Sequence, residues 1–507
     1  MRTAANMRPT HLISMAFMIL AAAPALAGSA GPDVGPGLEA LRSGRFDEAG
    51  ARFVQLSLQE PGAPEGPFYE AFQTWWRLID RSADAALRLA MEQRLAESAR
   101  RARAMESSDD ADLRQRGLVF LGVSLLIDAQ SKAARGAHFS AAGQARQGHR
   151  ALSRAVAERP ADADALFAMG TYNYYADHLP AFVKGLRFLL LIPGGDSAAG
   201  IHQLERAGAE SRLFGVESLV LLAHIFSGSY EEDYARALGY LDRAVSATSG
   251  SPMVSLARAD LLYKMGRLAE AAEVSRLSLE KTTKADDYPS QLVRALAFRL
   301  AACRMKLRDP LAALRGMDET LAGNLPETEV EQKRWLTLWG EAAHDVGRIG
   351  ELEPLMRRIG APESVANQIR KKFGSTTGDP VAALRAEAFG LAAANRSRDA
   401  VDQFQAIATE APGDPRIQYD LGRLLQQQGR LGEATPHLKA AVDLAKGSSS
   451  ADLAGWALLR LGWQLEQEGK RTEAVQLYRR AADLKQFGFR AAALERLARQ
   501  GAPPPEG

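Results

Sequence analysis

The sequence predicts an all-α fold in which pairs of helices stack into a superhelical solenoid. A pattern of small and apolar residues recurs in the C-terminal part: Ala400 and Ala434 are 34 positions apart, and Ala474 follows 40 positions later, after a longer loop. Within each interval the apolar residues fall three and four apart, as on one face of a helix. No sustained apolar–polar alternation between turn residues indicates a strand. The chain is therefore expected to be nearly all helix.

The first element is a predicted export signal. Arg2 and Arg8 precede an apolar run from Leu12 to Ala23, and Ala25-Leu26-Ala27 supplies small residues for cleavage. This is the order of a secretory signal peptide. We expect residues 1–27 to be removed after Ala27 and the mature chain to be periplasmic or otherwise exported. An uncleaved membrane anchor is the alternative, although the run is shorter than the ~20 residues that span a bilayer.

The composition excludes several classes of function. The formal charge is +2, and removal of residues 1–27 takes away two arginines and no acid, which leaves 0. A neutral chain offers no electrostatic basis for nucleic-acid binding. Cys303 is the single cysteine and reads as a small buried residue. No histidine pair has the spacing with Glu that a helical zinc site needs. We therefore expect no cofactor, no metal and no catalytic residues.

The segment 28–360 is predicted to hold degenerate repeats of the same kind. Gly44-Arg45-Phe46-Asp47-Glu48-Ala49 and Gly266-Arg267-Leu268-Ala269-Glu270-Ala271 have the form of a turn followed by a second helix. Trp339-Gly340 with Gly347 marks the last unit that can be placed there. Residues 361–380 are rich in helix-breaking residues and are predicted to be a linker.

The segment 381–500 contains the clearest repeats. Leu421-Gly422 and Leu461-Gly462 put a glycine in each first helix, and Ala434 and Ala474 put a small residue in each second helix. Small residues allow the two helices to cross closely, and a larger side chain there would overpack the crossing at a cost of roughly 1–3 kcal/mol. The stretch after Phe487 is expected to form a capping helix, and 501–507 a loose tail.

These residues resemble the tetratricopeptide repeat (TPR) family. In that family a small residue follows a leucine in the first helix, and an alanine marks the second helix. Leu421-Gly422, Leu461-Gly462, Ala434 and Ala474 match that pattern residue by residue. The resemblance implies a TPR-type superhelix whose usual output is a surface for binding proteins.

A segment at 172–204 interrupts the repeat pattern. Its middle, 179–192, is apolar on nearly all sides, and Asp196 is placed to cap the following helix. Such a short apolar helix is either core, a partner site or a membrane contact. The candidate contact residues of this insertion are Tyr174, Tyr175, His178, Phe182 and Phe188.

Residues 163–226 resemble a bacterial group of exported TPR proteins of undefined activity. The Tyr172-Asn173-Tyr174-Tyr175, Leu179-Pro180 and Pro193-Gly194-Gly195-Asp196 elements are shared with that group. The segment is also distantly similar to a eukaryotic repeat family linked to inclusion-body clearance. The resemblance implies no catalytic residues.

A candidate partner-binding groove follows from the first helices of the last three units. It comprises Arg385, Phe389, Tyr419, Arg423 and Trp463, a mixture of aromatic and cationic side chains that suits a peptide or helix. The alternative is that some of them pack only against a neighbouring repeat. The lysine and asparagine set with which some repeat domains clamp a terminal carboxylate is not reproduced.

Three functional hypotheses remain open at this point. The favoured one is a non-enzymatic periplasmic TPR scaffold with a protein or peptide partner and no nucleic acid. The alternative is an envelope-assembly factor that docks on a membrane through the 179–192 helix, a contact that is not favoured. A weaker alternative is an enzyme with a site near His178 and Tyr174. The sequence leaves the partner, the pathway and the oligomeric state open.

Overall fold

The computed structural model describes residues 31–78, 84–178, 193–283, 288, 290–374, 381–445, 451–484 and 489–503. Over these ranges the regular structure consists of helices, with no strand. The predicted all-α fold is confirmed. The signal peptide, the 179–192 helix with Phe182 and Phe188, and the end of the C-terminal tail lie outside the described residues.

The chain divides into two compact units. The first runs to Glu231 and takes in Gly239–Val254, and the second takes in Glu232–Leu238, Ser255–Asp286 and the chain from Ser290. The helices wholly inside the first unit are α2 (Gly35–Arg42), α3 (Phe46–Gln59), α4 (Glu65–Leu78), α5 (Ala85–Met105), α6 (Ala111–Ala134), α7 (His138–Glu158), α8 (Ala163–Asp177), α10 (Ser197–Glu210) and α11 (Gly215–Phe226).

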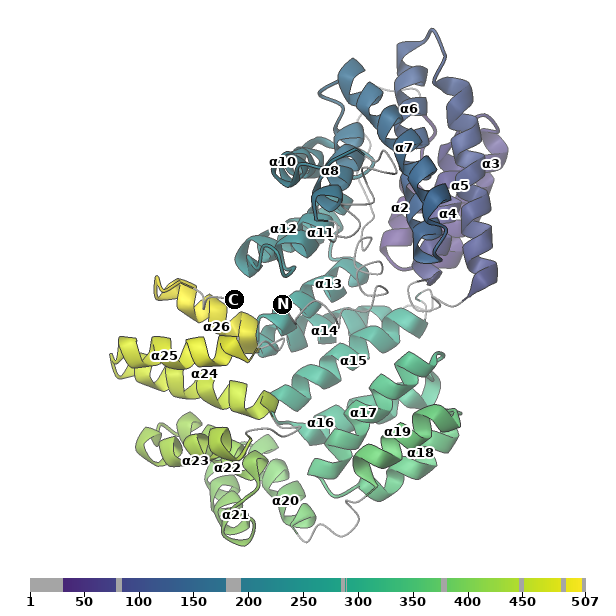
Figure 1. Cartoon of the computed structure of the whole chain (residues 1–507). Coiled ribbons are helices and arrows are strands. Elements are labelled where there is room, and N and C mark those ends of the chain that lie inside the picture. Colours follow the sequence, from purple (N-terminus) through teal and green to yellow (C-terminus); the bar gives the residue numbers. More distant parts are fainter. Residues whose placement is uncertain are drawn as a thin grey trace. The chain divides into compact units, whose positions relative to one another are not determined.

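Two helices contain the sequence boundaries between the units, namely α12 (Tyr234–Ala247) and α13 (Pro252–Lys264). The helices of the second unit that follow them are α14 (Leu268–Thr283), α15 (Ser290–Lys306), α16 (Pro310–Gly323), α17 (Glu329–Asp345), the 3-10 helix η2 (Ile349–Glu351), α18 (Leu352–Arg358), α19 (Glu363–Phe373), α20 (Ala382–Ala393), α21 (Ser397–Glu410), α22 (Pro415–Gln427), α23 (Leu431–Leu444), α24 (Ala451–Gln467), α25 (Arg471–Asp483) and α26 (Phe489–Arg499). Consecutive helices form hairpin-like pairs (Figure 1).

The turn inside a helix pair passes through the left-handed region of backbone conformation. Gly266 and Gly429 hold this place with φ of 74° each. Glycine fits because it has no Cβ that would meet the neighbouring carbonyl. Near the start of each second helix an alanine is fully buried, Ala271 in α14 and Ala434 in α23. The repeat signature of the sequence thus marks a turn and the helix crossing that follows it.

Glycines in the first helices allow close approach of the second. A Cβ at Gly422 would lie 2.7 Å from the Leu438 side chain, and one at Gly462 would lie 2.5 Å from the Tyr478 ring. Both large residues are fully buried. The expectation that small residues permit a close crossing is therefore confirmed, and the space they leave is filled by the large residue of the second helix.

The described part of the 172–204 segment is a tight crossing of α8 and α10. A Cβ at Gly170 would lie 2.8 Å from the Gly200 carbonyl oxygen, and a Cβ at Gly200 would lie 2.8 Å from that of Gly170. The Asp196 side chain accepts a hydrogen bond from the Ala199 N–H at 2.9 Å, so the predicted helix cap is confirmed. The interruption of the repeat pattern thus contains a helix pair with backbone-to-backbone contact.

The stretch 361–380 differs from the predicted linker. The structure has helix α19 in it, which buries Val365, Ile369 and Phe373 at helical spacing. Phe373 packs on Gly340 of α17, where an added Cβ would lie 2.6 Å from its ring. The linker was predicted because helix-breaking residues are concentrated after Phe373. The helices on either side of it belong to the second unit, so the division between the units lies earlier in the chain.

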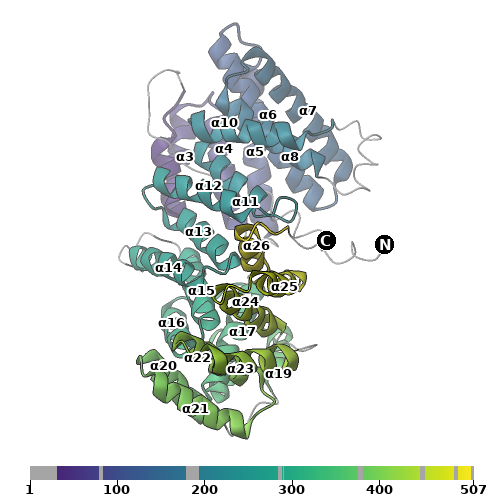
Figure 2. The same cartoon turned by 90° about the vertical axis from the view of Figure 1, so that its left-hand side faces the viewer.

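The C-terminal repeats pack back on the start of the second unit. An added Cβ at Gly266, in the turn before α14, would lie 2.9 Å from the Ala492 side chain of α26 and 2.9 Å from the Trp456 ring of α24. Lys306 at the end of α15 forms an ion pair with Asp452 of α24. In both views α24 and α26 lie beside α13–α15 (Figures 1 and 2).

Helix α6 meets the length and composition criteria for a membrane span. It is the single such helix among the described residues, and 61% of its apolar window is buried inside the fold. A buried core helix passes the same test, and the packing of α6 against its neighbours accounts for its apolar character.

Candidate functional site

The predicted groove residues are mostly interior. Arg385 and Phe389 on α20 and Tyr419 and Arg423 on α22 are buried, with 6% exposure or less. Trp463 on α24 is partly exposed. Four of the five therefore do not line an open surface, which corresponds to the alternative that they pack within the repeats.

A buried ionic centre explains the polar residues of this region. Arg308, in the turn before α16, donates hydrogen bonds of 2.8 and 2.7 Å to the two carboxylate oxygens of Asp420 on α22. It donates a third, of 2.7 Å, to Asp345 at the end of α17. The guanidinium also lies 5.2 Å from the centre of the Phe389 ring. We call Arg308, Asp345 and Asp420 the second-unit arginine centre.

Charge pairing in this centre outweighs desolvation. Burial by itself would raise the pKa of Asp345, but Arg308, His344 and Arg416 together hold that pKa well below its usual range. Arg385 donates a 2.9 Å hydrogen bond to the carbonyl oxygen of His344, which also accepts backbone N–H groups at the end of α17. The predicted groove residue Arg385 thus stabilises a helix terminus.

Tyr419 and Arg423 belong to the same interior. Arg460 of α24 donates a 3.2 Å hydrogen bond to the Tyr419 hydroxyl. The guanidinium of Arg423 lies 3.8 Å from the Asp420 carboxylate and donates a 3.2 Å hydrogen bond to Gln427. Burial lowers the pKa of Arg423, although Asp420 opposes this shift. These contacts link neighbouring first helices and leave little for a partner to bind.

The first unit has an ionic pair of similar placement but poorer geometry. Arg42, at the end of α2, lies 3.6 Å from Glu217 on α11, and both side chains are buried. Five buried polar atoms here have no hydrogen-bond partner among the described residues: Nε and Nη2 of Arg42, both carboxylate oxygens of Glu217 and the Tyr69 hydroxyl. Burial raises the pKa of Glu217 to about 7, which Arg42 opposes and Asp164 reinforces. We call Arg42 and Glu217 the first-unit arginine pair.

The predicted insertion contacts that the structure describes form an aromatic stack. Tyr174 is buried, and its ring lies 4.3 Å from that of His178, which in turn lies 4.4 Å from that of Tyr230. His178 Nδ1 lies 2.9 Å from the Tyr174 carbonyl oxygen. Burial, with Glu231 nearby, raises the pKa of Tyr174 further above neutrality. Tyr175 is partly exposed, with its hydroxyl buried.

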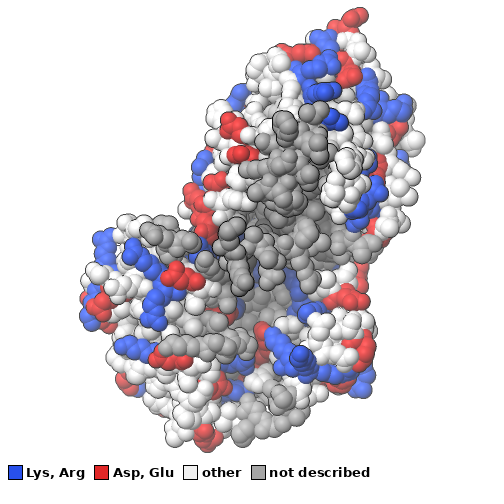
Figure 3. Space-filling view, viewed as in Figure 1, with Lys and Arg blue, Asp and Glu red and all other residues white. Residues whose placement is uncertain are grey.

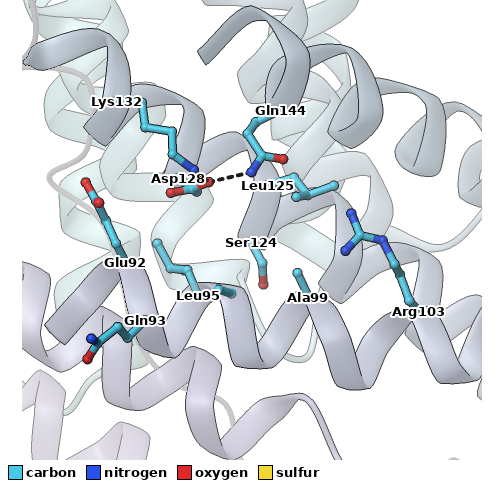
Figure 4. Close-up of a pocket in the computed structure, with 11 residues that line it drawn as sticks. Glu92, Gln93, Leu95, Ala99, Arg103, Ser124, Leu125, Asp128, Lys132 and Gln144 are labelled. Carbon is cyan, nitrogen blue, oxygen red and sulfur yellow. Dashed lines mark hydrogen bonds and ion pairs between the residues drawn. The ribbon is translucent and has the colours of Figure 1, made fainter. Parts of the chain in front are cut away.

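A polar pocket lies between α5, α6 and α7 in the first unit. Its volume is about 280 Å³, and Leu95, Ala99 and Leu125 form its apolar lining. Lys132 and Gln144 both reach Asp128 (Figure 4): Asp128 accepts a 2.9 Å hydrogen bond from Gln144 and pairs with Lys132. Internal pairing therefore satisfies the strongest polar groups of this pocket.

An apolar groove of about 450 Å³ lies between α15 and α17 in the second unit. Its lining residues are Phe298, Val330, Lys333, Arg334, Thr337, Leu338 and Glu341. Val330, one of the lining residues, is 70% exposed. The Arg334 guanidinium lies 4.7 Å from the centre of the Phe298 ring. We call these seven lining residues the α15–α17 groove. It was not predicted from the sequence.

No group of three or more His, Cys, Asp or Glu side chains within the described ranges is arranged to hold a metal ion. Cys303 is fully buried, and burial raises its pKa to about 12. A thiol in this state is a poor nucleophile at neutral pH.

Helix pairs with a left-handed turn, a buried alanine and stacked first helices define a solenoid repeat protein. Comparisons with known proteins name the repeat: two family models described as tetratricopeptide repeat match residues 414–486 and 229–289. The chain therefore contains tetratricopeptide repeats in these two stretches.

Solved structures similar to the chain include two repeat proteins. The crystal structure of yeast Tom70 is 12% identical, covers 87% of this chain and 96% of its own, and gives a TM-score of 0.31. A human IFIT1 dimer with PPP-AAAA is 13% identical, covers 82% of this chain and 96% of its own, and gives a TM-score of 0.31. No curated protein matches the chain.

Proposed function

We propose that this chain is a non-enzymatic scaffold that binds another protein through the α15–α17 groove and works in the periplasm or another exported location. Tetratricopeptide repeats generally mediate protein–protein interaction, which supports the class of function. The observation that carries the choice of surface is Val330, a large aliphatic residue left 70% exposed beside an apolar hollow on two first helices. Exposed apolar surface rimmed by polar groups is typical of a protein interaction site.

The other candidate surfaces support the proposal by contrast. Four of the five predicted groove residues are buried, and the pocket at α5–α7 contains the pairing of Asp128 with Lys132 and Gln144. On the face shown in Figure 3, Lys and Arg are interspersed with Asp and Glu, without a continuous positive field. A protein partner is therefore favoured over nucleic acid, which needs such a field.

The non-enzymatic role is proposed because the suspected acid–base residues are used structurally. His178 lies between two tyrosine rings with Nδ1 at a backbone carbonyl, and the pKa of Tyr174 is shifted away from neutrality. A general acid or base works best with a pKa near the operating pH. The stacked arrangement of His178 and the raised pKa of Tyr174 favour a packing role for these residues.

The experiment is isolation of a stoichiometric complex from envelope extracts by affinity purification and size-exclusion chromatography. The substitution Val330→Asp should abolish the complex while the circular dichroism spectrum and Tm stay unchanged. A matched control is Leu58→Asp on α3, because Leu58 is 75% exposed and lies in the first unit. The proposal fails if Val330→Asp leaves the complex intact or if Leu58→Asp abolishes it equally.

The exported location has its own test. The order of charged, apolar and small residues in 1–27 supports cleavage after Ala27. The mature protein is expected in the periplasmic fraction with Gly28 as its first residue, as read by mass spectrometry of its N-terminal peptide. A cytoplasmic full-length chain would contradict this part of the proposal.

A further inference from the structure

The α15–α17 groove has a surplus of positive charge that points to a class of partner. We infer that it binds a segment of the partner protein in which a large apolar side chain is flanked by carboxylates. This inference rests on the proposed function, because it names the chemistry that the same groove would recognise.

The charge argument starts from the three ionisable residues of the groove. Glu341 is neutralised by Lys372 of α19, whose Nζ lies 2.6 Å from its carboxylate. Lys333 is hydrogen-bonded to the amide of Gln368, which carries no charge. Arg334 stacks on Phe298 and has no carboxylate within ion-pair distance in the described part of the chain. The groove therefore presents two cations, neither of which has an ion pair with an acid of the described residues.

The position of Arg334 differs from that of two arginines at α14. Arg267 and Arg276 are partly exposed, and each reaches an acid three residues away, Glu270 and Glu273 respectively. Arg334 instead lies over the Phe298 ring, 4.7 Å from its centre, without an ion pair to an acid of the described residues, and a guanidinium can donate to both oxygens of a carboxylate. A carboxylate docked there would gain charge-assisted hydrogen bonds at a partly desolvated site.

The apolar argument gives the second element of the ligand. Phe298 and Leu338 are partly buried at the groove, and Val330 stands exposed near its end. A volume of about 450 Å³ accommodates a large aliphatic or aromatic side chain. Burial of such a side chain supplies affinity, while the flanking charges supply orientation and rate of association.

The length of the groove sets the length of the segment. From Val330 to Glu341 the helix α17 rises roughly 16 Å at ~1.5 Å per residue. An extended strand rises about 3.3 Å per residue, so about five residues of the partner span the groove. The segment therefore carries one apolar anchor with acids within two positions of it.

The test uses fluorescein-labelled peptides and the full chain, with binding read by fluorescence anisotropy at low and high salt. The first peptide has one leucine flanked by glutamates, and matched peptides replace the glutamates by glutamine, the glutamates by lysine, or the leucine by serine. The first peptide should bind at least roughly tenfold more tightly than each of the others, and its affinity should fall with salt.

Charge-reversal variants locate the binding. Arg334→Glu should weaken the first peptide at least roughly tenfold, because it replaces an attraction by a repulsion. Arg398→Glu on α21, an equally exposed arginine outside the groove, should leave the affinity unchanged. Both variants should keep the wild-type Tm, since surface substitutions of this kind usually change stability by less than about 0.5 kcal/mol.

Several outcomes would overturn the inference. The inference is contradicted if the glutamine peptide binds as tightly as the first peptide, or if the lysine peptide binds more tightly. It is also contradicted if no peptide binds, or if Arg334→Glu has no effect. Binding to vesicles of anionic phospholipid that Arg334→Glu abolishes, with no peptide bound, would assign the cations to a membrane instead. A different result would contradict the proposed function, namely a complex with the partner that stays intact after Val330→Asp.

Discussion

The two units bury an arginine in comparable places and satisfy it differently. Arg308 in the second unit makes three short hydrogen bonds to two carboxylates, and Asp345 keeps its charge because its pKa is held low. Arg42 in the first unit faces one carboxylate at 3.6 Å, and the pKa of Glu217 is raised to about 7. One centre is an ion pair over the whole neutral range, whereas the other titrates within it.

This difference shows that burial alone does not fix what an ion pair does for stability. Taking two charges out of water costs several kcal/mol per ion, and only good geometry with further hydrogen bonds offsets that cost. The second-unit arginine centre has both, and the first-unit arginine pair has neither among its described partners. We therefore expect removal of Arg308 to be costly and removal of the Glu217 charge to be tolerated.

The largest effect is expected for Arg308→Gly. Arg308 has φ of 62°, a conformation that glycine adopts in the equivalent turns at Gly266 and Gly429, so the backbone should be kept. Loss of the guanidinium removes its hydrogen bonds and leaves the buried Asp345 and Asp420 with longer ion pairs, 3.6 Å to Arg416 and 3.8 Å to Arg423. This should lower the free energy of unfolding of the second unit by about 3–5 kcal/mol. Native-state hydrogen exchange over α17 and α22 measures this loss.

A partial rescue separates charge from packing in that experiment. Adding Asp345→Asn and Asp420→Asn to Arg308→Gly removes the two buried carboxylate charges that have lost Arg308 and should recover part of the lost stability. A cost of less than about 1 kcal/mol for Arg308→Gly alone would show that the centre is not the stabilising device we describe.

A smaller effect is expected where glycines set helix crossings. An added methyl at Gly200 in the first unit meets backbone atoms of Tyr174 and Gly170 at 2.7 and 2.8 Å, whereas one at Gly422 in the second unit first meets the Leu438 side chain. Backbone cannot rotate away, so Gly200→Ala should cost more than Gly422→Ala within a range of about 1–3 kcal/mol. Denaturant titration gives both values, with Gly432→Ala, which has nothing within 4 Å, as the control. The reverse order would contradict the tight α8–α10 crossing.

The last effect concerns the pH dependence of the first unit, which is small per pH unit. Glu217 binds a proton more tightly in the folded state, with a pKa of about 7 against ~4.3 unfolded, so its contribution to stability falls as pH rises through this window. The slope is at most about 1.4 kcal/mol per pH unit for one proton. Glu217→Gln should flatten this dependence between pH 5 and pH 8.

The groups that face Glu217 enter the same measurement. Arg42, Asp164 and Tyr69 interact with it electrostatically, and the pKa of Asp164 is itself raised, first by burial. The exposed carboxylate Glu210 on α10 provides the control Glu210→Gln, which should leave the slope unchanged. A wild-type stability of the first unit that does not fall from pH 5 to pH 8 would contradict a raised pKa.

The sequence predicted the repeats because their signals are local. The glycine of the turn, the alanine that follows it and the apolar spacing of each helix all lie within one helix pair, as at Gly429 and Ala434. The linker prediction for 361–380 missed helix α19. Helix-breaking residues cluster after Phe373, whereas Val365 and Ile369 form only a short apolar face. A weak amphipathic pattern next to a strong breaker is easily overlooked.

The candidate site was harder to predict because it depends on residues far apart in the chain. Arg385, Tyr419 and Arg423 sit at first-helix positions that usually face a groove, but Arg308, 112 positions before Asp420, fills the space beside them. One local signal was present: Arg308 occupies a turn position where other pairs have glycine. A non-glycine residue in this left-handed conformation needs stabilising contacts, and the carboxylates of Asp345 and Asp420 supply them.

The central claim is that the partner binds on α15 and α17 and not on the predicted groove residues of α20, α22 and α24. Hydrogen–deuterium exchange of the full chain, free and saturated with its partner, tests this most directly. We predict slower exchange over 290–306 and 329–345, with no change over 382–393 and 415–427. Protection confined to α20, α22 and α24, with α15 and α17 unaffected, would contradict the account.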